Sequence, residues 1–199
     1  MTKRIGGPAA VLAILTCGLL LRSQDKTDPV QELRTQLRRL EARVQELERR
    51  QLPVALQERY RARWAQDEQR FTRAQMAEIE QRYQSVQGNW GTPEAIGTLN
   101  GLISKFPEAD RAGCALLYLG QMTQGKQREE YLKEAIAKHS DAMYGDMVQV
   151  GAFARFLLAT DYLQSGRTAE AAELFAAIRS QYPDAVDHSG THLSALIPK

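Results

Sequence analysis

The sequence predicts an all-α protein, because three successive stretches carry apolar residues at helical spacings. The spacing alternates between three and four over residues 29–52, is about 3.6 over 54–88, and from 92 to 199 marks short helices separated by Gly and Pro. An uncharged apolar run precedes them. We therefore expect a membrane or signal helix at 1–22, a coiled-coil helix at 29–52, a long amphipathic helix at 54–88 and a helical-repeat domain at 92–199.

The composition excludes two classes of protein. The 199 residues are 43% hydrophobic and 25% charged, with a formal net charge of +2, so neither a disordered tail nor a strongly cationic nucleic-acid binder fits. Two cysteines, Cys17 and Cys114, are too few for a disulfide framework.

The N-terminus carries an export or anchoring signal. Lys3 and Arg4 precede the uncharged apolar run at 5–21, and Arg22 ends it. At about 1.5 Å per residue this run spans roughly 25 Å, slightly less than the ~30 Å hydrocarbon core of a bilayer. No small-x-small cleavage site follows, which favours an uncleaved transmembrane signal-anchor over a cleaved signal peptide. A lipid anchor on Cys17 is a third alternative.

The orientation of the body depends on the charges that flank this run. More basic residues follow it than precede it, which by itself favours a cytoplasmic body. A very short basic N-terminal tail, however, behaves like the start of a signal peptide, and long domains translocate largely regardless of their charge. We therefore expect a membrane-anchored protein whose body is periplasmic or otherwise extracytoplasmic.

Residues 29–52 are a predicted coiled coil. Asp28 suits the cap and Pro29 the first position of a helix, and nearly all residues between the apolar ones are Arg, Glu or Gln. The apolar seam consists of Val30, Leu33, Leu37, Leu40, Val44 and Leu47. A stripe this narrow cannot be buried in a globular core, so a partner helix must cover it and we expect a homo-oligomer, either a dimer or a trimer. The alternative is a single helix that lies back on the C-terminal domain.

Pro53 ends this pattern, because proline removes a backbone hydrogen bond and clashes with the preceding turn. One amphipathic helix is then predicted over 54–88, with the apolar residues Leu56, Tyr60, Trp64, Phe71, Ile79, Tyr83 and Val86. Arginines lie among the aromatic residues, as in a nucleic-acid-binding face, but acidic residues neutralise most of that charge. We expect no nucleic acid and interpret this stretch as a solvated face beside an aromatic packing stripe.

The last predicted unit, at 152–183, is a helix, a turn and a second helix. It resembles the tetratricopeptide repeat (TPR) family in residues at the family's spacing: Leu158, Ala159, Tyr162, Gly166, Ala171, Phe175 and Pro183. Arg155 departs from the family, which more often places a bulky residue there. The second-helix spacing recurs 76 positions earlier, with a degraded unit (helices at about 111–122 and 128–138) in between. Since 76 exceeds two 34-residue periods by eight, we expect an insertion at 140–147. A generic small helical bundle is the alternative.

Residues 105–110 are similar to the repeats of bacterial envelope TPR proteins. With the export signal and the coiled coil, the layout resembles the periplasmic Tol-associated cell-division coordinator family, whose members join an oligomerising coiled coil to a C-terminal TPR domain. The resemblance implies that the first helices bind an extended peptide on their concave face. Carried onto this chain, the groove residues are Arg111, Cys114, Tyr118, Met122, Phe153, Phe156, Thr160 and Gln164. Phe153 and Phe156 would form an anchor pocket, or else pack against the upstream helix or a neighbouring subunit.

No catalytic or cofactor-binding motif stands out: the sequence lacks a Walker loop, a nucleophile elbow, His-Glu-x-x-His and Cys-x-x-Cys. His188 and His192 could hold a metal only on a continuous helix, which Ser189-Gly190 interrupts, so we expect a polar tail and no metal. The sequence therefore predicts a non-enzymatic, membrane-tethered scaffold or adaptor whose TPR-like domain binds a protein partner in the cell envelope. A structural oligomerising spacer without a peptide-binding groove is the alternative, and an enzyme with a metal at the two histidines is a third hypothesis.

Overall fold

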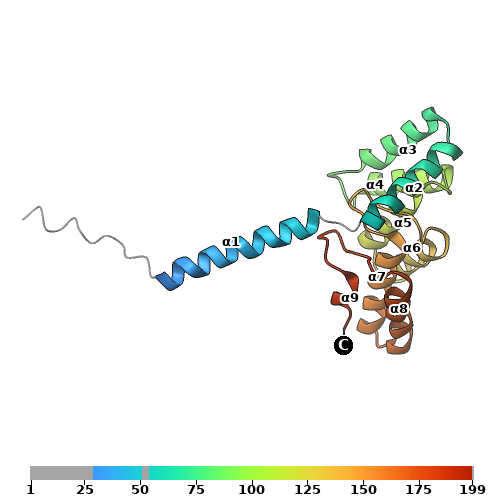
Figure 1. Ribbon diagram of the computed structural model, residues 1–199. Coiled ribbons are helices and arrows are strands. Elements are labelled where there is room, and N and C mark those ends of the chain that lie inside the picture. Colours follow the sequence, from blue (N-terminus) through green and yellow to red (C-terminus); the bar gives the residue numbers. More distant parts are fainter. Residues whose placement is uncertain (1–28, 51–53, 199) are drawn as a thin grey trace, which may run out of the picture. The chain divides into compact units, whose positions relative to one another are not determined.

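The computed structural model describes residues 29–50 and 54–198, which form two compact units that divide between Glu46 and Leu47 and are described separately here. The described residues are helical, apart from turns and two isolated β-bridges, which confirms the all-α expectation (Figure 1). The helices are α1 Pro29–Arg50, α2 Val54–Arg70, α3 Arg73–Ser85, α4 Pro93–Lys105, α5 Asp110–Met122, α6 Gly125–Lys138, α7 Val150–Gln164, α8 Thr168–Gln181 and α9 Leu193–Leu196.

Helix α1 exposes the apolar seam that the sequence predicts. Val30, Leu33, Leu37 and Leu40 are between 51% and 65% exposed, while the side chains of Val44 and Leu47 lie outside the described part. None of the helices in 29–50 and 54–198 combines the length and the apolarity needed to cross a bilayer. The predicted anchor at 5–21 lies outside the described residues, so it stays a prediction.

The expected single helix over 54–88 is wrong, because the structure divides this stretch into α2 and α3. Thr72 starts the second helix with a capping box. Its hydroxyl oxygen accepts from the backbone N–H of Gln75 at 3.3 Å, and its own N–H donates to the Gln75 side chain at 2.9 Å. Phe71, at the break, packs edge-on against the Phe106 ring with centroids 5.9 Å apart.

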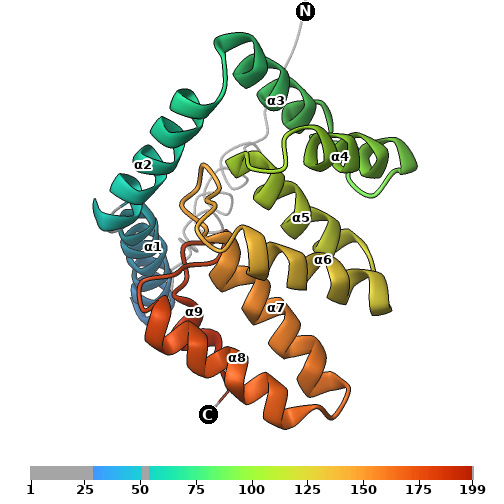
Figure 2. The same cartoon turned by 90° about the vertical axis from the view of Figure 1, so that its right-hand side faces the viewer.

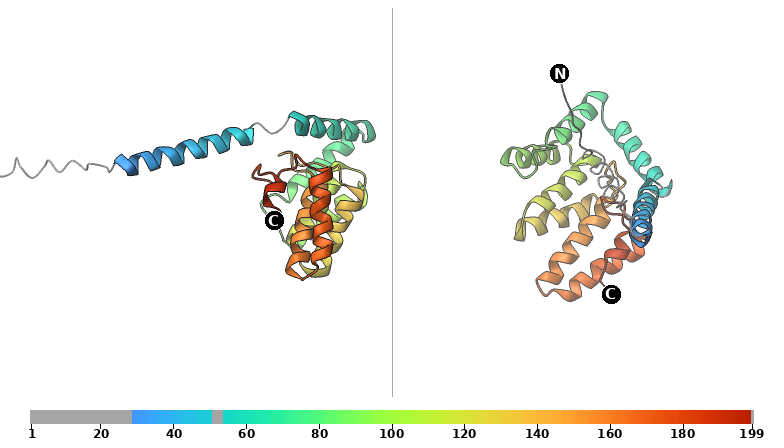
Figure 3. Two further views of the ribbon diagram at one scale, coloured as in Figure 1. Left: turned by 60° about the horizontal axis from the view of Figure 1, so that its bottom comes forward. Right: turned by 90° about the vertical axis from the view of Figure 1, so that its left-hand side faces the viewer.

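Helices α3 to α8 pack as successive antiparallel pairs, which together with α2 form an arc (Figure 2). The right-hand view of Figure 3 shows the same arc from the opposite side. The pairs α5/α6 and α7/α8 correspond to the two predicted repeat units, and α8 ends just before Pro183, the last residue of the predicted unit at 152–183. Leucine side chains with no more than 1% exposure fill the core between the pairs: Leu99, Leu102, Leu116, Leu117, Leu119 and Leu132.

The insertion predicted at 140–147 falls within the segment between α6 and α7, residues 139–149, hereafter the inserted segment. It folds back on itself through an antiparallel bridge between Met143 and Gln149, and Met147 adopts a φ of 70° in the turn. Figure 2 shows the inserted segment inside the arc. Its residues Met143, Tyr144 and Val148 are at most 5% exposed, so the insertion is part of the packed structure rather than a surface loop.

Arg155 holds the inserted segment against α7 and α8. Its guanidinium donates to the Ser140 hydroxyl at 3.2 Å, to the Gly151 carbonyl at 2.8 Å and to the Tyr182 hydroxyl at 3.2 Å. This contact explains the departure from the TPR pattern, because a long donor at this position reaches a segment that an uninterrupted repeat lacks.

The first half of α2 packs across the opening of the arc. Leu56, which is fully buried, forms a small apolar cluster with Met143 of the inserted segment and with Val186. Val186 lies between α8 and α9, in residues 182–192, hereafter the C-terminal segment. Tyr60 and Met147 pack against the same cluster. Helix α2, at the start of the arc, therefore contacts both the inserted segment before α7 and the C-terminal segment after α8.

Gly151→Ala tests the close approach of α7 to the inserted segment. A Cβ atom at residue 151 would lie 2.7 Å from the Ser140 Cα, which is backbone and cannot move aside. We expect a loss of about 1–3 kcal/mol in the free energy of unfolding, measured by urea denaturation. Gly97→Ala in α4 is the control, because no atom lies within 4 Å of its Cβ position and it should gain roughly 0.5–1 kcal/mol. Equal effects of the two changes would contradict the packing.

Candidate functional site

The groove residues that the sequence predicts lie on α5 and α7, the first helices of their pairs. Tyr118, Met122, Phe153, Phe156 and Thr160 are half-buried and Gln164 is exposed. Arg111 and Cys114 do not, since they are 8% and 0% exposed.

Arg111 is buried because α2 and α3 cover the first turns of α5. Its guanidinium donates to the Glu80 carboxylate at 2.8 and 3.2 Å and lies 4.6 Å from the centre of the Tyr83 ring. The charge of the guanidinium is therefore paired with Glu80 and its flat face packs on Tyr83, so neither is open to a ligand. The expectation that Arg111 lines an open groove is wrong, since the helix spacing identifies the face but not the helix that covers it.

Cys114 lies under the inserted segment. Its sulfur is 3.5 Å from the Met143 carbonyl oxygen, and burial raises the pKa of its thiol, which keeps the sulfur protonated. Tyr144 lies beside it, only 5% exposed, and donates its hydroxyl to the Cys114 carbonyl at 2.8 Å. The inserted segment thus occupies the concave side of α5 that a bound peptide would contact in an uninterrupted array.

A continuous series of rings, hereafter the aromatic row, crosses the concave side. Each ring centre lies between 4.4 and 6.3 Å from the next. In spatial order the members are Trp90, Tyr118, Tyr144, His188, Phe153, Phe156 and Phe175. Trp90 is 39% exposed at one end, and the Phe153 and Phe156 rings lie within 5° of parallel near the other. The row therefore joins the predicted residues on α5 to those on α7.

Sequence reasoning placed Phe175 in the repeat packing instead of the groove, and it missed three further members of the row, Trp90, Tyr144 and His188. All three lie in connecting segments, where no helical period indicates which way a side chain faces. His188 is the link between the C-terminal and inserted segments: its Nδ1 is 2.7 Å from the Asp146 carboxylate, and its ring contacts Tyr144 and Phe153.

His188 and His192 are not on a common helix. A bridge between Val186 and His192 makes this stretch a tight turn before α9. Nowhere in 29–50 or 54–198 do three His, Cys, Asp or Glu side chains converge as they would around a metal ion.

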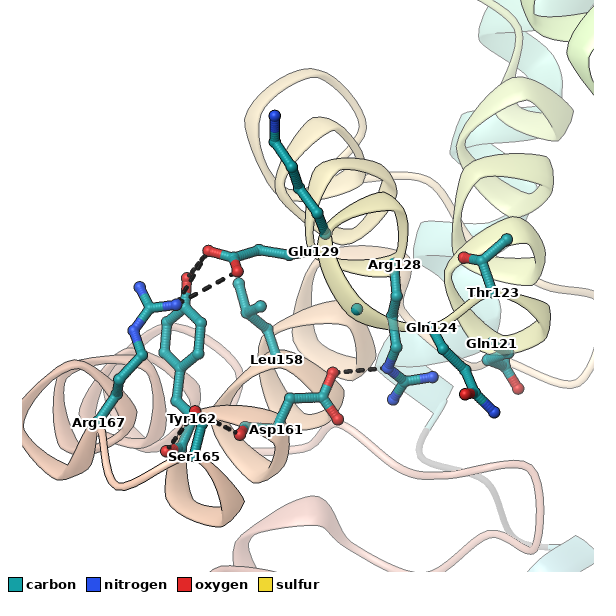
Figure 4. Close-up of a pocket in the computed structure, with 12 residues that line it drawn as sticks. Gln121, Thr123, Gln124, Arg128, Glu129, Leu158, Asp161, Tyr162, Ser165 and Arg167 are labelled. Carbon is teal, nitrogen blue, oxygen red and sulfur yellow. Dashed lines mark hydrogen bonds and ion pairs between the residues drawn. The ribbon is translucent and has the colours of Figure 1, made fainter.

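A polar cavity of about 600 Å³ lies between the α5–α6 turn and the α7–α8 turn (Figure 4). Four of the charged lining residues, Arg128, Glu129, Asp161 and Arg167, form contacts across the two repeat units. Arg128 donates to Asp161 at 2.6 Å, and Glu129 accepts from the Tyr162 hydroxyl at 2.8 Å and from Arg167 at 3.2 Å. These contacts lock the two helical pairs together, and we assign the cavity a structural role.

Two buried carboxylates connect α2, α5 and the inserted segment. Asp67 on α2 accepts the N–H of Asp110 at 2.8 Å and so caps α5, because Ala109 at the cap position has no side-chain acceptor. Asp110 in turn accepts from the backbone N–H of Met143 at 3.0 Å and from Arg63 at 3.3 Å. Burial raises the pKa of Asp110 to about 6 and also raises the pKa of Asp67.

Asp110→Asn should flatten the dependence of stability on pH. Because the folded pKa of about 6 exceeds the unfolded value of 3.8, the folded protein keeps a proton that the unfolded chain releases. The free energy of unfolding should therefore fall as pH rises from about 4 to 6, by up to roughly 3 kcal/mol for this group.

Asn keeps the acceptor oxygen but cannot ionise, so the variant should lose this contribution in denaturation curves at pH 4, 5 and 6. Asp141→Asn is the control, since Asp141 also pairs with Arg63 but its side chain is 68% exposed. The same pH profile for wild type and Asp110→Asn would contradict the assignment.

A tetratricopeptide repeat family model matches residues 153–185, which cover most of α7, all of α8 and the turn that follows. No curated protein and no solved structure matches the chain. The match and the successive helical pairs indicate a TPR-type protein. Repeats of this type are typically non-catalytic modules, and they suggest a role in protein–protein interaction.

Proposed function

We propose that this protein is a membrane-tethered adaptor of the cell envelope that self-associates through α1 and binds a protein partner with its repeat domain. The observation that carries the proposal is the aromatic row on the concave side of a TPR-type array. Aromatic side chains supply large contact areas at a small entropic cost, and interface energy concentrates on them.

The partner site that we propose has its centre at Phe153 and Phe156 on α7. Their parallel rings are half-buried, and Thr160 and Gln164 continue the same helix face toward solvent. At the other end of the row, Trp90 stacks on Tyr118 with ring centres 4.4 Å apart. The inserted segment covers the middle, so we expect the partner to contact the α7 end rather than the whole concave face.

The exposed apolar side chains of α1 support the self-association that we propose. Leu33, Leu37 and Leu40 are 56–65% exposed on a helix whose other side chains are mostly charged or amides. A second copy of the same helix is the simplest partner, because its own seam has the matching spacing.

The membrane tether is the part of the proposal that rests on sequence alone. The uncharged run at 5–21 behind two basic residues supports an anchor, and the resemblance in layout to the Tol-associated coordinator family supports an extracytoplasmic body. Under this proposal α1 extends from the membrane side and the repeat domain meets a partner in the envelope.

An oligomerising spacer is a second candidate, and one observation favours it. Tyr144 and His188 come from the protein's own connecting segments and occupy the middle of the row. Part of the concave side is therefore already covered by the protein's own side chains. A spacer would self-associate through α1 and would bind no partner with the repeat domain.

Capture from solubilised envelope membranes separates the two candidates. The full chain should retain a specific partner, and Phe156→Asp should abolish that capture while leaving the helicity measured by circular dichroism unchanged. Phe153→Ser is a milder second variant, because the Phe156 ring also contacts the buried Phe175. Tyr131→Ser on α6 is the control, since Tyr131 is half-buried but outside the aromatic row. Stable oligomers that capture nothing would favour the spacer.

Replacement of Leu33, Leu37 and Leu40 by Gln tests the seam. We expect the wild-type chain to sediment as a dimer or a trimer and the triple variant as a monomer, because Gln gains nothing from burial against another helix. The melting of the repeat domain should not change. Arg38→Gln, on the same helix but outside the seam, is the control and should remain oligomeric. A monomeric wild type would refute self-association.

A further inference from the structure

The position of His188 shows what kind of side chain the middle of the aromatic row accepts. The centre of its ring lies 5.1 Å from that of Tyr144 and 5.2 Å from that of Phe153, and both pairs are nearly perpendicular. Its Nδ1 atom is 2.7 Å from the Asp146 carboxylate. A planar group with a hydrogen-bonding nitrogen thus lies between two aromatic rings and an acid.

Asp146 is an accessible anion beside the row. Its side chain is 47% exposed, and it pairs with no Lys or Arg in the described part of the chain. Its Oδ1 atom accepts only a long bond, at 3.5 Å, from the N–H of Val148. The nearby acid Asp187 is used inside its own turn, where it accepts the N–H groups of Ser189 and Thr191 at 2.8 and 2.9 Å. Asp146 is therefore the acid that a partner can reach here.

The His188 ring can leave its position while the turn that carries it stays folded. An antiparallel bridge joins Val186 to His192, and the N–H of Leu193 donates to the Ala185 carbonyl at 2.9 Å. These bonds hold the turn on both sides without the imidazole. Because the His188 side chain is already 37% exposed, a rotation about its own side-chain bonds moves the ring into water.

A guanidinium group suits this position better than the imidazole does. It is planar, it keeps its positive charge at every physiological pH, and it can donate two parallel N–H bonds to a carboxylate such as Asp146. It is also weakly hydrated and packs well against aromatic rings, which Tyr144 and Phe153 supply here. A lysine ammonium is neither planar nor weakly hydrated, and an acidic or aliphatic side chain has no donor for the carboxylate.

We infer that the partner presents an arginine whose guanidinium displaces the His188 ring and pairs with Asp146. The residues beside this arginine pack on Phe153 and Phe156. The inference rests on the proposed function, because it names the side chain that the partner brings to the α7 end of the aromatic row. His188 is then an internal competitor, which covers the site until the arginine arrives.

A library of random six-residue peptides, acetylated and amidated at their ends, tests the ion pair with the full chain. The selected peptides should be enriched in Arg over Lys. Replacement of that Arg by citrulline, its neutral isostere, should weaken binding at least about tenfold. The same replacement should have little effect on binding to Asp146→Asn, which keeps an acceptor oxygen but has no charge.

Asp141→Asn is the matched control, because Asp141 is an exposed acid of the same inserted segment and lies outside the aromatic row. This variant should be as sensitive to citrulline as the wild type. No enrichment in Arg, or equal sensitivity of the wild type and Asp146→Asn to citrulline, would overturn the inference.

His188→Ala tests the competition. The best arginine peptide should bind this variant at least about threefold more tightly than the wild type, because no ring has to be displaced. The melting temperature should change little, since the backbone bonds of the turn remain. His192→Ala, which removes an exposed histidine of the same turn outside the row, should leave the affinity unchanged. Unchanged or weaker binding to His188→Ala would show that the ring is part of the site wall and would overturn the inference.

Capture from solubilised envelope membranes separates failure of this inference from failure of the proposed function. Both Asp146→Asn and Phe156→Asp should retain less of the partner than the wild type does. Capture that is lost in Phe156→Asp but survives in full in Asp146→Asn would overturn the arginine inference alone. A wild-type chain that captures no partner would overturn both.

Discussion

The structure of the repeat domain depends on one buried carboxylate, that of Asp110. It stands at the start of α5, where the Asp67 side chain of α2 accepts its N–H, and its own oxygen accepts the N–H of Met143 in the inserted segment. Arg63 supplies a compensating charge. A charge buried in this way is stable only while its partners stay in place, so α2, α5 and the inserted segment must assemble together.

The inserted segment is therefore part of the packed repeat domain as well as a departure from the repeat period. It places Tyr144 in the aromatic row, and its Met143 packs against Leu56 of α2. Arg155 fixes the same segment through Ser140. Residues 139–149 thus supply the aromatic row and the cluster around Leu56 with side chains that a regular repeat does not have.

Local signals predicted α8 well, because Gly166, with a φ of 79°, and Pro183 lie on either side of it. The division between α2 and α3 was missed because the Thr72 capping box sits inside an uninterrupted apolar period. The TPR resemblance places Arg111 in a groove, but it cannot show that α2 and α3 lie over that face of α5. The positions of the Tyr144 and His188 rings could not be predicted for a related reason. Only long-range packing sets the direction of a side chain in a connecting segment.

The contact of Leu56 with Val186 constrains how this array can change. In an open solenoid each repeat touches only its neighbours, so units can be duplicated or lost with little effect on the rest. Here α2 meets residues on both sides of the last helical pair, and an added or deleted pair would carry Val186 away from Leu56. The contact between Leu56 and Val186 therefore constrains the number of helical pairs. Related sequences should differ in their helix surfaces and turns rather than in the number of repeats.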